Sequence, residues 1–337
     1  MQAEIDILEN DILEKYPEVL DKLLLDNSTE TKKNIFWATD NYQELGDAYK
    51  FSSQIFPELI TGDNGHIIMP RVKKDKDLQQ TRAREMAEVF TPSWICNAQN
   101  NLIDEAWFQQ ENVFNTEIVL ANGTRNWRVN DNKITYPEGK SWKDYIRDTR
   151  LEMACGEAPY ITSRYDTTTG EFMPIEKRIG ILDRKLRVIN ENVELSGEWL
   201  KAAQTAYKNT YAFEWQGDSL LLAREAMLMT FIENYKLKFG KEPLLESIQY
   251  IAYIIAWNVW QMDGLKGVVP NSCFVKEIEF KNIFGEIEIK KIPCEGCTNN
   301  EINKHNGTYC LIKDWGKKDL ETGRSGRKMK FIELLKN

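Results

Sequence analysis

Apolar and polar residues alternate along much of the chain with the period of an α-helix. Near the start, apolar side chains recur at steps of three and four, the spacing of one helix face: Ile5, Leu8, Ile12, Tyr16, Val19, Leu20 and Leu23. A second helix is expected between Ile35 and Tyr49. The same spacing predicts further helices over residues 94–106, 176–192, 196–209, 217–239 and 243–257.

Residues 150–154 predict a short strand before Gly156, and the apolar stretch over residues 259–263 predicts a short buried strand that ends at a turn. Residues 110–145 are polar and rich in turn-forming pairs such as Asn122-Gly123, so they predict an irregular insert. Residues 273–312 have the spacing of short strands around a cysteine-bearing turn. No internal repeat is present.

The composition predicts a folded protein without membrane-spanning segments. The 337 residues suffice for one large domain or two modest ones, and a hydrophobic content of 42% allows a packed core. No apolar run approaches the ~18 residues of a membrane span. The segment Met1–Asp6 is acidic and lacks the positive start of a signal peptide, so a cytoplasmic location is expected.

The formal net charge of −8 argues against a broad basic surface for DNA, but two local stretches are basic. The first contains Arg71, Lys73, Lys74, Lys76, Arg82 and Arg84. The second contains Lys317, Lys318, Arg324, Arg327, Lys328 and Lys330. Each is more simply a solvated loop, and contact with phosphates is the alternative. Trp257, Trp260 and Trp315 are expected to be core residues, and a platform on which a base stacks is the alternative.

Cysteine spacing near the C-terminus predicts a zinc site. The chain has six cysteines and no secretion signal, so disulfides are not expected. Cys294, Cys297, His305 and Cys310 follow the pattern C-x2-C-x7-H-x4-C, and four such ligands would close a structural Zn²⁺ site. Cys273 is a spare ligand that could replace His305. Free cytosolic thiols are the alternative.

Three further segments are ordinary when taken singly. The run from Glu152 to Tyr160 (Glu-Met-Ala-Cys-Gly-Glu-Ala-Pro-Tyr) follows a predicted strand, and its glycine would let backbone approach a nucleotide-like ligand. Phe90-Thr-Pro92 is a typical helix start. Asp263 ends an apolar stretch, where an acidic residue can accept hydrogen bonds from ribose hydroxyls.

Taken together and in this order, the three segments resemble the adenine-specific (N6) DNA methyltransferases of restriction–modification systems. Phe90-Thr-Pro92 is similar to the F/Y-T-P segment of that family. Ala154-Cys-Gly156 matches the centre of its D-P-A-C-G-S-G segment, with Glu152 in the place of the Asp. Val259-Trp-Gln-Met-Asp263 is similar to its acidic strand end. The sequence also looks like chains described as "restriction endonuclease subunit M" over most of its length.

This resemblance implies an α/β fold with a Rossmann-like core that binds S-adenosylmethionine. Phe90, Thr91 and Pro92 would pack near the cofactor, and the backbone of residues 154–157, including Cys155 and Gly156, would approach its methionine part. Asp263 would hold the ribose, with Asp183 as the weaker candidate. The chain then divides into a helical N-terminal region (1–85), a cofactor domain with a helical insert (86–272) and a C-terminal segment with a zinc knuckle (273–337).

The sequence departs from the family in two respects. Glu157 and Ala158 replace the Ser and the second Gly of the loop, and a carboxylate at Glu157 would repel the methionine carboxylate. The ten prolines include no adjacent pair, so the N/D-P-P-Y segment that holds the flipped adenine in the family is absent. A separate catalytic polypeptide, a non-catalytic descendant and an unfamiliar residue set all remain open.

The sequence therefore predicts the modification subunit, or the cofactor-binding half, of a DNA adenine methyltransferase. DNA and a catalytic or specificity subunit would be its partners. A methyltransferase-derived protein that only binds DNA or protein is the alternative.

Overall fold

The computed structural model describes residues 6–85, 91–281, 284 and 286–336, which form a mixed α/β structure. The α-helices are α1 (Glu9–Lys15), α2 (Val19–Leu24), α3 (Lys76–Glu85), α4 (Ser93–Phe108), α5 (Trp142–Arg147), α6 (Ile181–Asn192), α7 (Ser196–Lys208), α8 (Gly217–Phe239), α9 (Leu245–Asn258) and α10 (Glu295–Asn299). The strands are β1 (Asn115–Val119), β2 (Arg125–Val129), β3 (Arg150–Met153), β4 (Thr210–Glu214), β5 (Val259–Gln261), β6 (Lys276–Lys281), β7 (Ile287–Ile292), β8 (Leu311–Lys318) and β9 (Ser325–Lys330).

The central sheet is parallel and has the strand order β3-β4-β5. Helices α6 and α7 connect β3 to β4, and α8 and α9 connect β4 to β5. Each helical connection returns the chain to the same edge, which is how parallel strands must be joined. The carboxyl ends of all three strands therefore meet at one edge of the sheet.

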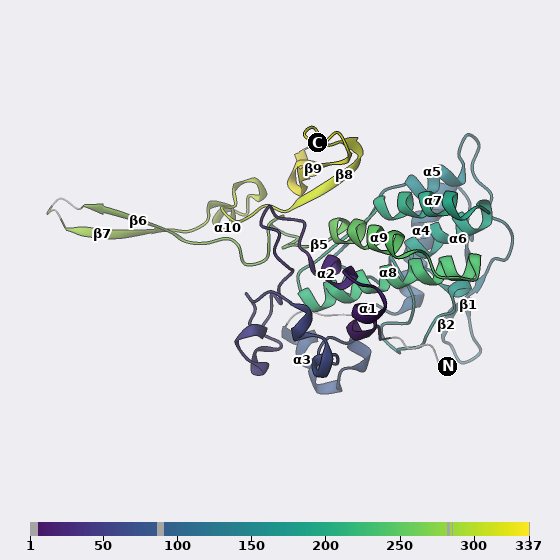
Figure 1. Cartoon of the computed structure of the whole chain (residues 1–337), viewed down its shortest axis with the longest axis horizontal. Helices are drawn as coiled ribbons and strands as arrows, with labels where there is room; N and C mark the ends of the chain where they lie inside the picture. The colour runs from purple at the N-terminus through teal and green to yellow at the C-terminus, as the bar shows by residue number, and fades with distance from the viewer. Residues whose placement is uncertain (1–5, 86–90, 282–283, 285, 337) are drawn as a thin grey trace.

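The helices enclose a large apolar core that includes Trp199, Phe231 and Ile255, each fully buried. Helix α8 is buried along most of its length and lies in the middle of this layer (Figure 1). The predicted helices over 196–209, 217–239 and 243–257 are confirmed within two residues at each end. Their length and high apolar content made them easier to predict than the short strands.

The other face of the sheet is only partly covered. A second cluster packs Phe213 of β4 and Trp260 of β5 against Phe331 from the C-terminal segment. On β3, which is paired with β4 alone among the described residues, Leu151 is 42% exposed and Met153 71% exposed. The sheet therefore has an open apolar end at β3.

The N-terminal region is less helical than its sequence pattern suggests. The predicted helix between Ile35 and Tyr49 is wrong, because this stretch is extended and then forms short 3-10 turns. Ile35 and Trp37 are both buried while Phe36 between them bridges Gln54, which is the two-residue period of extended chain.

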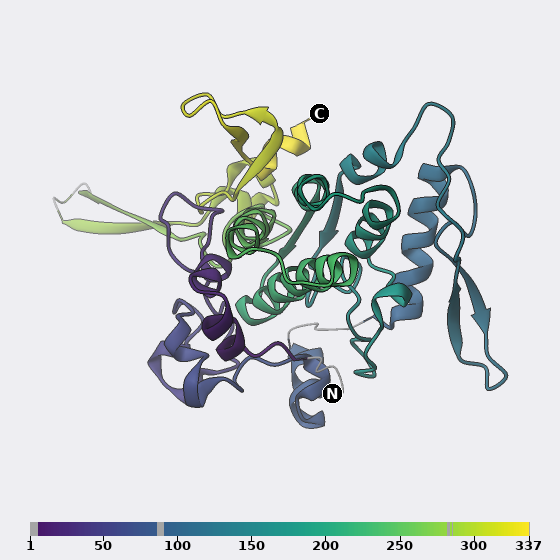
Figure 2. The same cartoon turned by 45° about the vertical axis from the view of Figure 1, so that its right-hand side comes forward.

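The expected irregular insert contains regular structure. Residues 110–145 include the antiparallel hairpin β1–β2, which projects beside α4 (Figure 2), and the short helix α5. The sequence does not predict these strands because most of their residues are polar and do not alternate regularly with apolar ones.

A second hairpin, β6–β7, extends from the body of the molecule as a long arm (Figure 1). Every residue of both strands is exposed. Helix α10 lies at the root of this arm, and the β8–β9 hairpin follows it in the chain. Among the described residues, no helix is both long enough and apolar enough to cross a membrane.

Candidate functional site

The loop after β3 has an unusual backbone at the carboxyl edge of the sheet. Ala154, Gly156 and Ala158 all have positive φ angles, of 51°, 53° and 57°. Glycine adopts this conformation freely, whereas alanine in it costs about 1–2 kcal/mol. Strained backbone of this kind concentrates at binding and catalytic sites, so the loop is the first candidate for a ligand site.

Glu214 joins this loop from the end of the neighbouring strand β4. Its Oε2 accepts a 2.8 Å hydrogen bond from the backbone N–H of Gly156, and its Oε1 accepts a 3.1 Å bond from the N–H of Gln216. Burial raises the pKa of the Glu214 carboxyl, and these backbone hydrogen bonds oppose that effect. Glu214 is not recognisable from the sequence alone, because the pattern of residues 210–214 does not predict the strand that it ends.

The Glu157 carboxylate is held by donors of the protein itself. Glu157 is buried, and its two oxygens accept hydrogen bonds from the backbone N–H of Arg71 at 2.7 Å and from the hydroxyl of Tyr165 at 2.5 Å. The repulsion of a ligand carboxylate by Glu157 stays a prediction.

Glu152 lies on β3 just before the loop. Its Oε1 is 3.5 Å from the backbone N of Tyr160, and its Oε2 is buried without a hydrogen-bond partner in the described part of the chain. Burial raises the pKa of this carboxyl well above its ordinary value. Cys155 is buried beside it, and burial likewise raises the pKa of its thiol.

Thr91 and Pro92 precede α4 and lie against the segment that follows the loop. The Thr91 carbonyl accepts a 3.3 Å hydrogen bond from the hydroxyl of Thr167, and Pro92 stands at the N-cap of α4. Asp166 Oδ2 accepts a 2.8 Å bond from the first helical N–H, that of Ser93. The structure thus brings Thr91 and Pro92 close to the loop region, while Phe90 lies outside the described residues.

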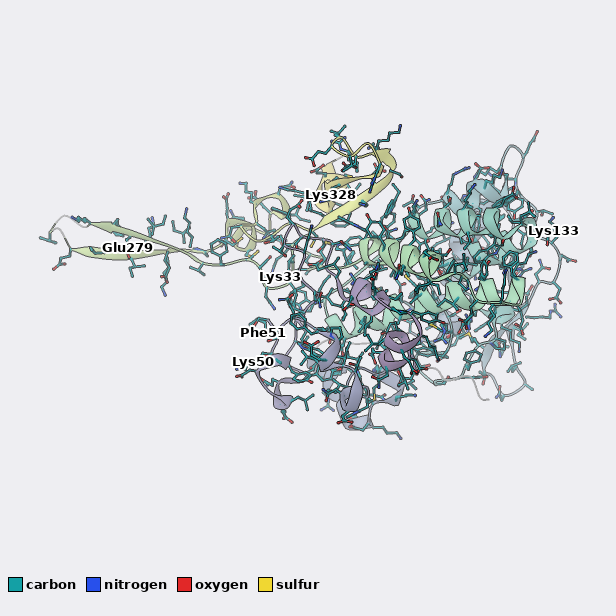
Figure 3. The ribbon with its side chains drawn as sticks, in the orientation of Figure 1. Lys33, Lys50, Phe51, Lys133, Glu279 and Lys328 are labelled. Carbon is teal, nitrogen blue, oxygen red and sulfur yellow. The ribbon has the colours of Figure 1, made fainter. Side chains whose placement is uncertain are left out.

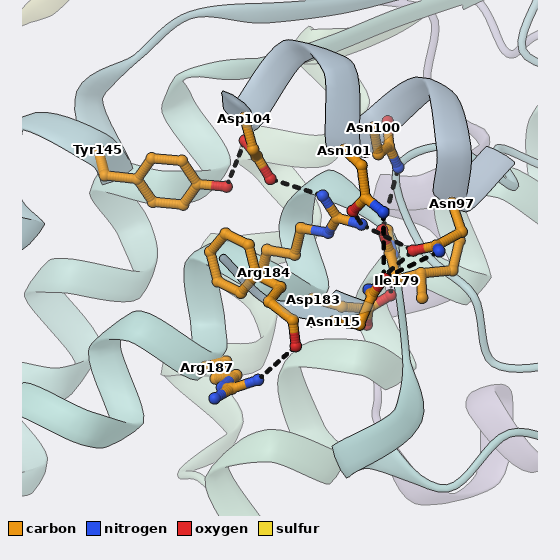
Figure 4. Close-up of polar contacts among 12 residues, drawn as sticks. Asn97, Asn100, Asn101, Asp104, Asn115, Tyr145, Ile179, Asp183, Arg184 and Arg187 are labelled. Atoms are coloured by element: carbon orange, nitrogen blue, oxygen red, sulfur yellow. Dashed lines mark hydrogen bonds and ion pairs between the residues drawn. The ribbon is translucent and has the colours of Figure 1, made fainter. Parts of the chain in front are cut away.

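A buried polar network fixes α4 against α6 (Figure 4). The guanidinium of Arg184 donates to Asp104 at 2.6 Å, to Asn97 at 2.9 Å and to Asn101 at 2.8 Å. Asn97 and Asn115 exchange two further hydrogen bonds. Because all these side chains are buried, the network holds the middle of α4 against α6.

The two ribose candidates from the sequence occupy different settings. Asp183 caps α6, where its Oδ2 accepts hydrogen bonds from Ser163 and from the backbone N–H of Gly180. Asp263 follows β5, and its carboxylate accepts the N–H of Leu265 at 3.1 Å and pairs with Lys266 at 3.0 Å. Since β4 lies between β3 and β5, Glu214 is nearer than Asp263 to the strained loop.

Two residues of the basic stretch between residues 71 and 84 form ion pairs inside the protein. Lys74 and Arg82 are buried and form ion pairs with Asp218 at 3.4 Å and 2.8 Å. The hydroxyl of Tyr42 donates to the same carboxylate at 2.8 Å. Lys74 and Arg82 therefore tie the N-terminal region to the start of α8 and do not face phosphates.

A cluster of three cysteines and one histidine forms the candidate metal centre. The cluster consists of Cys273, Cys294, Cys297 and His305, whose potential ligand atoms all lie within 4.8 Å of one another. His305 Nδ1 is 3.6 Å from each of the three sulfur atoms. Zinc at about 2.3 Å from sulfur and about 2.0 Å from nitrogen in a tetrahedron would place sulfur and nitrogen about 3.5 Å apart, close to the observed distances. The group can hold a metal ion with little rearrangement.

Two glycines permit the close packing of this cluster. A Cβ at Gly296 would lie 2.6 Å from the backbone N of His305, and one at Gly307 would lie 3.0 Å from the Sγ of Cys273. Burial tends to raise the pKa of the Cys294 thiol, but hydrogen bonds from the N–H groups of Asn306 and Cys297 and from His305 lower it to about 6. A thiolate at neutral pH is the form that binds metal.

Cys310, which the sequence spacing placed in the metal set, lies outside the cluster. It is fully buried in the core between the sheet and the C-terminal segment, and its thiol contacts the backbone carbonyl of Gln261 at 3.4 Å. Cys273 occupies the place in the cluster that the sequence assigned to Cys310, and His305 belongs to the cluster as expected. All six cysteines are free thiols.

Comparison with known proteins adds no relative: no protein-family model matches the chain, and no curated protein or solved structure shows a significant similarity to it.

Proposed function

We propose that the chain binds S-adenosylmethionine at the carboxyl edge of the β3-β4-β5 sheet, as the cofactor-binding part of a DNA adenine-N6 methyltransferase. One observation carries the proposal. The strained loop of residues 154–158 follows one parallel strand, and the carboxylate of Glu214 ends the next. Ligands of open α/β sheets bind outside the carboxyl ends of the strands, and an acidic strand end there holds ribose hydroxyls.

Within this site, Glu214 is the better ribose residue and Asp263 the more distant one. Neighbouring strands lie about 4.8 Å apart, so a residue at the end of β4 is one spacing from the loop and one at the end of β5 is about two. The backbone of residues 154–157 would approach the methionine part of the cofactor. Bound S-adenosylmethionine would supply an activated methyl group, and Thr91 and Pro92 would close one side of its site.

The chemistry on adenine would need a further segment, because the chain contains no Pro-Pro pair. The open edge of β3 is a suitable place for it. Leu151 and Met153 are exposed there, and parallel sheets are normally covered on both faces and extended on both sides of a ligand crevice. We therefore include a catalytic or specificity subunit and DNA among the partners of this proposal.

We further propose that the metal of the Cys273, Cys294, Cys297 and His305 cluster is a structural Zn²⁺. Three thiolates and one imidazole nitrogen are a common zinc ligand set, and four protein ligands leave no open position for catalysis. Free cysteines at this site fit the reducing conditions of the cytoplasm.

A methyltransferase-like protein that only binds is the second candidate. The missing Pro-Pro segment favours it, since nothing else in the sequence is known to hold a flipped adenine. Both candidates share the cofactor edge, and they differ in whether methyl transfer follows binding.

Calorimetric titration with S-adenosylmethionine and S-adenosylhomocysteine tests the cofactor site. We expect micromolar binding by the wild type, a loss of about tenfold or more in Glu214→Ala, and a smaller loss in Asp263→Ala. Absence of heat at high protein concentration would overturn the proposal. Transfer of labelled methyl to DNA, measured with the protein alone, separates the enzyme from the binding protein.

A further inference from the structure

An open groove of about 780 Å³ lies between α9 and the β8–β9 hairpin. Its two walls come from segments distant in sequence, since one is a helix that leads into the central sheet and the other is the C-terminal hairpin. Four basic and two acidic side chains line it: Lys22, Lys313, Arg324 and Lys328, and Glu246 and Asp319. This local positive excess stands out in a chain whose formal net charge is −8.

The helical wall of the groove is one face of α9. Glu246, Gln249, Tyr250 and Tyr253 are spaced i, i+3, i+4 and i+7, so their side chains lie along the same stripe. Seven residues of α-helix span about 10 Å. This length matches about three nucleotides at the ~3.4 Å rise of stacked bases.

Aromatic rings form the floor of the groove. The rings of Tyr250 and Tyr253 are stacked, with an interplanar angle of 19° and centroids 6.1 Å apart. Trp315 packs edge-on against Tyr253, and its indole N–H donates to Asn258 at 2.7 Å. Tyr250 is 37% exposed, so part of this residue is accessible from the groove.

Lysine side chains lie over these rings. The Lys208 ammonium is 5.3 Å from the centroid of Tyr250 and 5.2 Å from that of Trp315. The Lys313 ammonium is 4.9 Å from Trp315 and donates a hydrogen bond to the hydroxyl of Tyr253. These cation–π contacts keep the lysine ammonium groups beside the aromatic rings. A single-stranded nucleic acid presents bases and phosphates in alternation, so it would find stacking surfaces and positive charges close together here.

The hairpin wall contributes exposed positive charge. Arg324 and Lys328 are exposed on β9 and its turn (Figure 3 labels Lys328). Lys328 forms a 3.5 Å surface ion pair with Glu30, which is weak because both side chains are exposed, and its ammonium lies 5.8 Å from the ring centroid of Trp257. Asp319 Oδ1 instead accepts the backbone N–H of Thr322 at 2.8 Å, which engages it in the hairpin turn.

The groove is separate from the proposed cofactor edge. Lys208 ends α7 two residues before β4 begins, and α9 runs directly into the start of β5. The groove side chains therefore lie near the amino ends of the strands, whereas the loop of residues 154–158 lies at their carboxyl ends.

We propose that this groove binds a short stretch of single-stranded nucleic acid, with bases stacked on Tyr250 and phosphates held by Arg324 and Lys328. The combination of accessible aromatic rings with flanking basic side chains is the recognition chemistry of sequence-tolerant single-strand binders. This inference goes beyond the proposed function, because it requires neither S-adenosylmethionine nor methyl transfer.

Fluorescence anisotropy with a fluorescein-labelled twelve-residue oligodeoxythymidylate tests the proposal on the full chain. We expect binding that weakens with salt, with a slope of log K against log salt of about −1.4 for the two phosphate contacts of Arg324 and Lys328. Tyr250→Ala should weaken binding about tenfold at constant salt, since each stacked base contributes measurably. Lys328→Ala should reduce the salt slope by about 0.7.

Matched controls are available at exposed positions far from the groove. Phe51→Ala removes an aromatic ring that is 43% exposed, and Lys133→Ala removes an exposed charge (both labelled in Figure 3). Both controls should bind the oligonucleotide like the wild type. Circular dichroism of each variant confirms that Tyr250→Ala and Lys328→Ala remain folded.

Three outcomes overturn the inference. The first is unchanged affinity in folded Tyr250→Ala and Lys328→Ala. The second is equal affinity for a duplex of the same length with no effect of Tyr250→Ala, which would indicate phosphate contacts alone. The third is preference for a polyglutamate peptide of equal charge, which would assign the groove to an acidic protein segment.

Discussion

The carboxylate of Glu214 accepts a 2.8 Å hydrogen bond from the backbone N–H of Gly156, and this bond joins the ends of two adjacent parallel strands. Ala154 and Ala158, two residues to either side of Gly156, share its left-handed backbone conformation. The geometry of the loop thus depends both on its own residues and on a side chain that arrives from β4.

Substitution of Gly156 tests this loop directly. Gly156 has φ 53°, so Gly156→Ala should cost about 1 kcal/mol of unfolding free energy and lower the affinity for S-adenosylmethionine about tenfold. Gly197→Ala is the matched control, because a Cβ there meets no atom within 4 Å and alanine favours the helix. Urea unfolding and calorimetry measure the two effects. Equal cofactor affinity in Gly156→Ala and wild type would show that the loop does not hold the ligand.

Metal content distinguishes the two candidate ligand sets. Cys297→Ser removes a sulfur 3.6 Å from His305 Nδ1 and should lower bound zinc from one ion per chain to a small fraction. Cys310→Ser should keep its zinc, because Cys310 contacts the carbonyl of Gln261 outside the cluster. Elemental analysis after gel filtration gives both values. Loss of zinc in Cys310→Ser, with retention in Cys273→Ser, would contradict the cluster.

The buried ion pair between Arg184 and Asp104 should dominate the attachment of α4. Arg184→Leu leaves the Asp104 carboxylate without its 2.6 Å partner and should cost about 3–5 kcal/mol. Arg147→Leu removes an exposed arginine from the neighbouring helix α5 and should change stability by less than about 0.5 kcal/mol. Urea denaturation measures both. A cost below 1 kcal/mol for Arg184→Leu would mean that other contacts hold the helix.

Two buried carboxyls predict a pH dependence of stability. Glu9 on α1 and Glu225 on α8 are buried, and the oxygens of both lack hydrogen-bond partners in the described part of the chain. Burial raises the pKa of Glu9 to about 8 and that of Glu225 well above its ordinary value. The folded state therefore binds these protons more tightly than the unfolded state does. Their contribution to stability is complete below pH ~4.3 and is lost as pH rises toward 8.

Glu9→Gln should remove this loss. We expect its melting temperature to exceed that of the wild type by about 5 °C at pH 8.5 and to be close to it at pH 5. Glu14→Gln, an exposed position on the same helix, should behave like the wild type at both values. The interpretation fails if Glu9→Gln gives the same difference at pH 5 and pH 8.5.

The long helices were predictable from sequence, and β4 was not. Helix α7 has an apolar face that its sequence displays directly, whereas α8 is buried on nearly all sides and is recognisable by the length of its apolar segment. Strand β4 is five residues long and lies between α7 and α8 with few residues on either side, so the helical patterns obscured it. Glu214 could be recognised as a strand end only once that strand was placed.

The metal set shows the limit of local spacing. Cys294, Cys297 and His305 are close in sequence, and the C-x2-C pattern found them. The fourth candidate ligand, Cys273, precedes the β6–β7 arm. The antiparallel pairing of β6 with β7 brings the chain back, so that Cys294 lies beside Cys273. Cys310 fits the linear spacing equally well, but the chain there has already entered the core ahead of β8.

The placement of Cys273 and Cys294 on either side of the β6–β7 arm would give a bound metal ion a role in chain entropy. Cys273 stands before β6 and Cys294 after β7, so an ion coordinated by both would cross-link the chain at residues 273 and 294. By analogy with a cross-link, closing a loop of roughly 20 residues removes about 3 kcal/mol of conformational freedom from the unfolded chain. A chelator would release that constraint and leave the exposed arm as a preferred point of proteolytic cleavage, while the helical core stays intact.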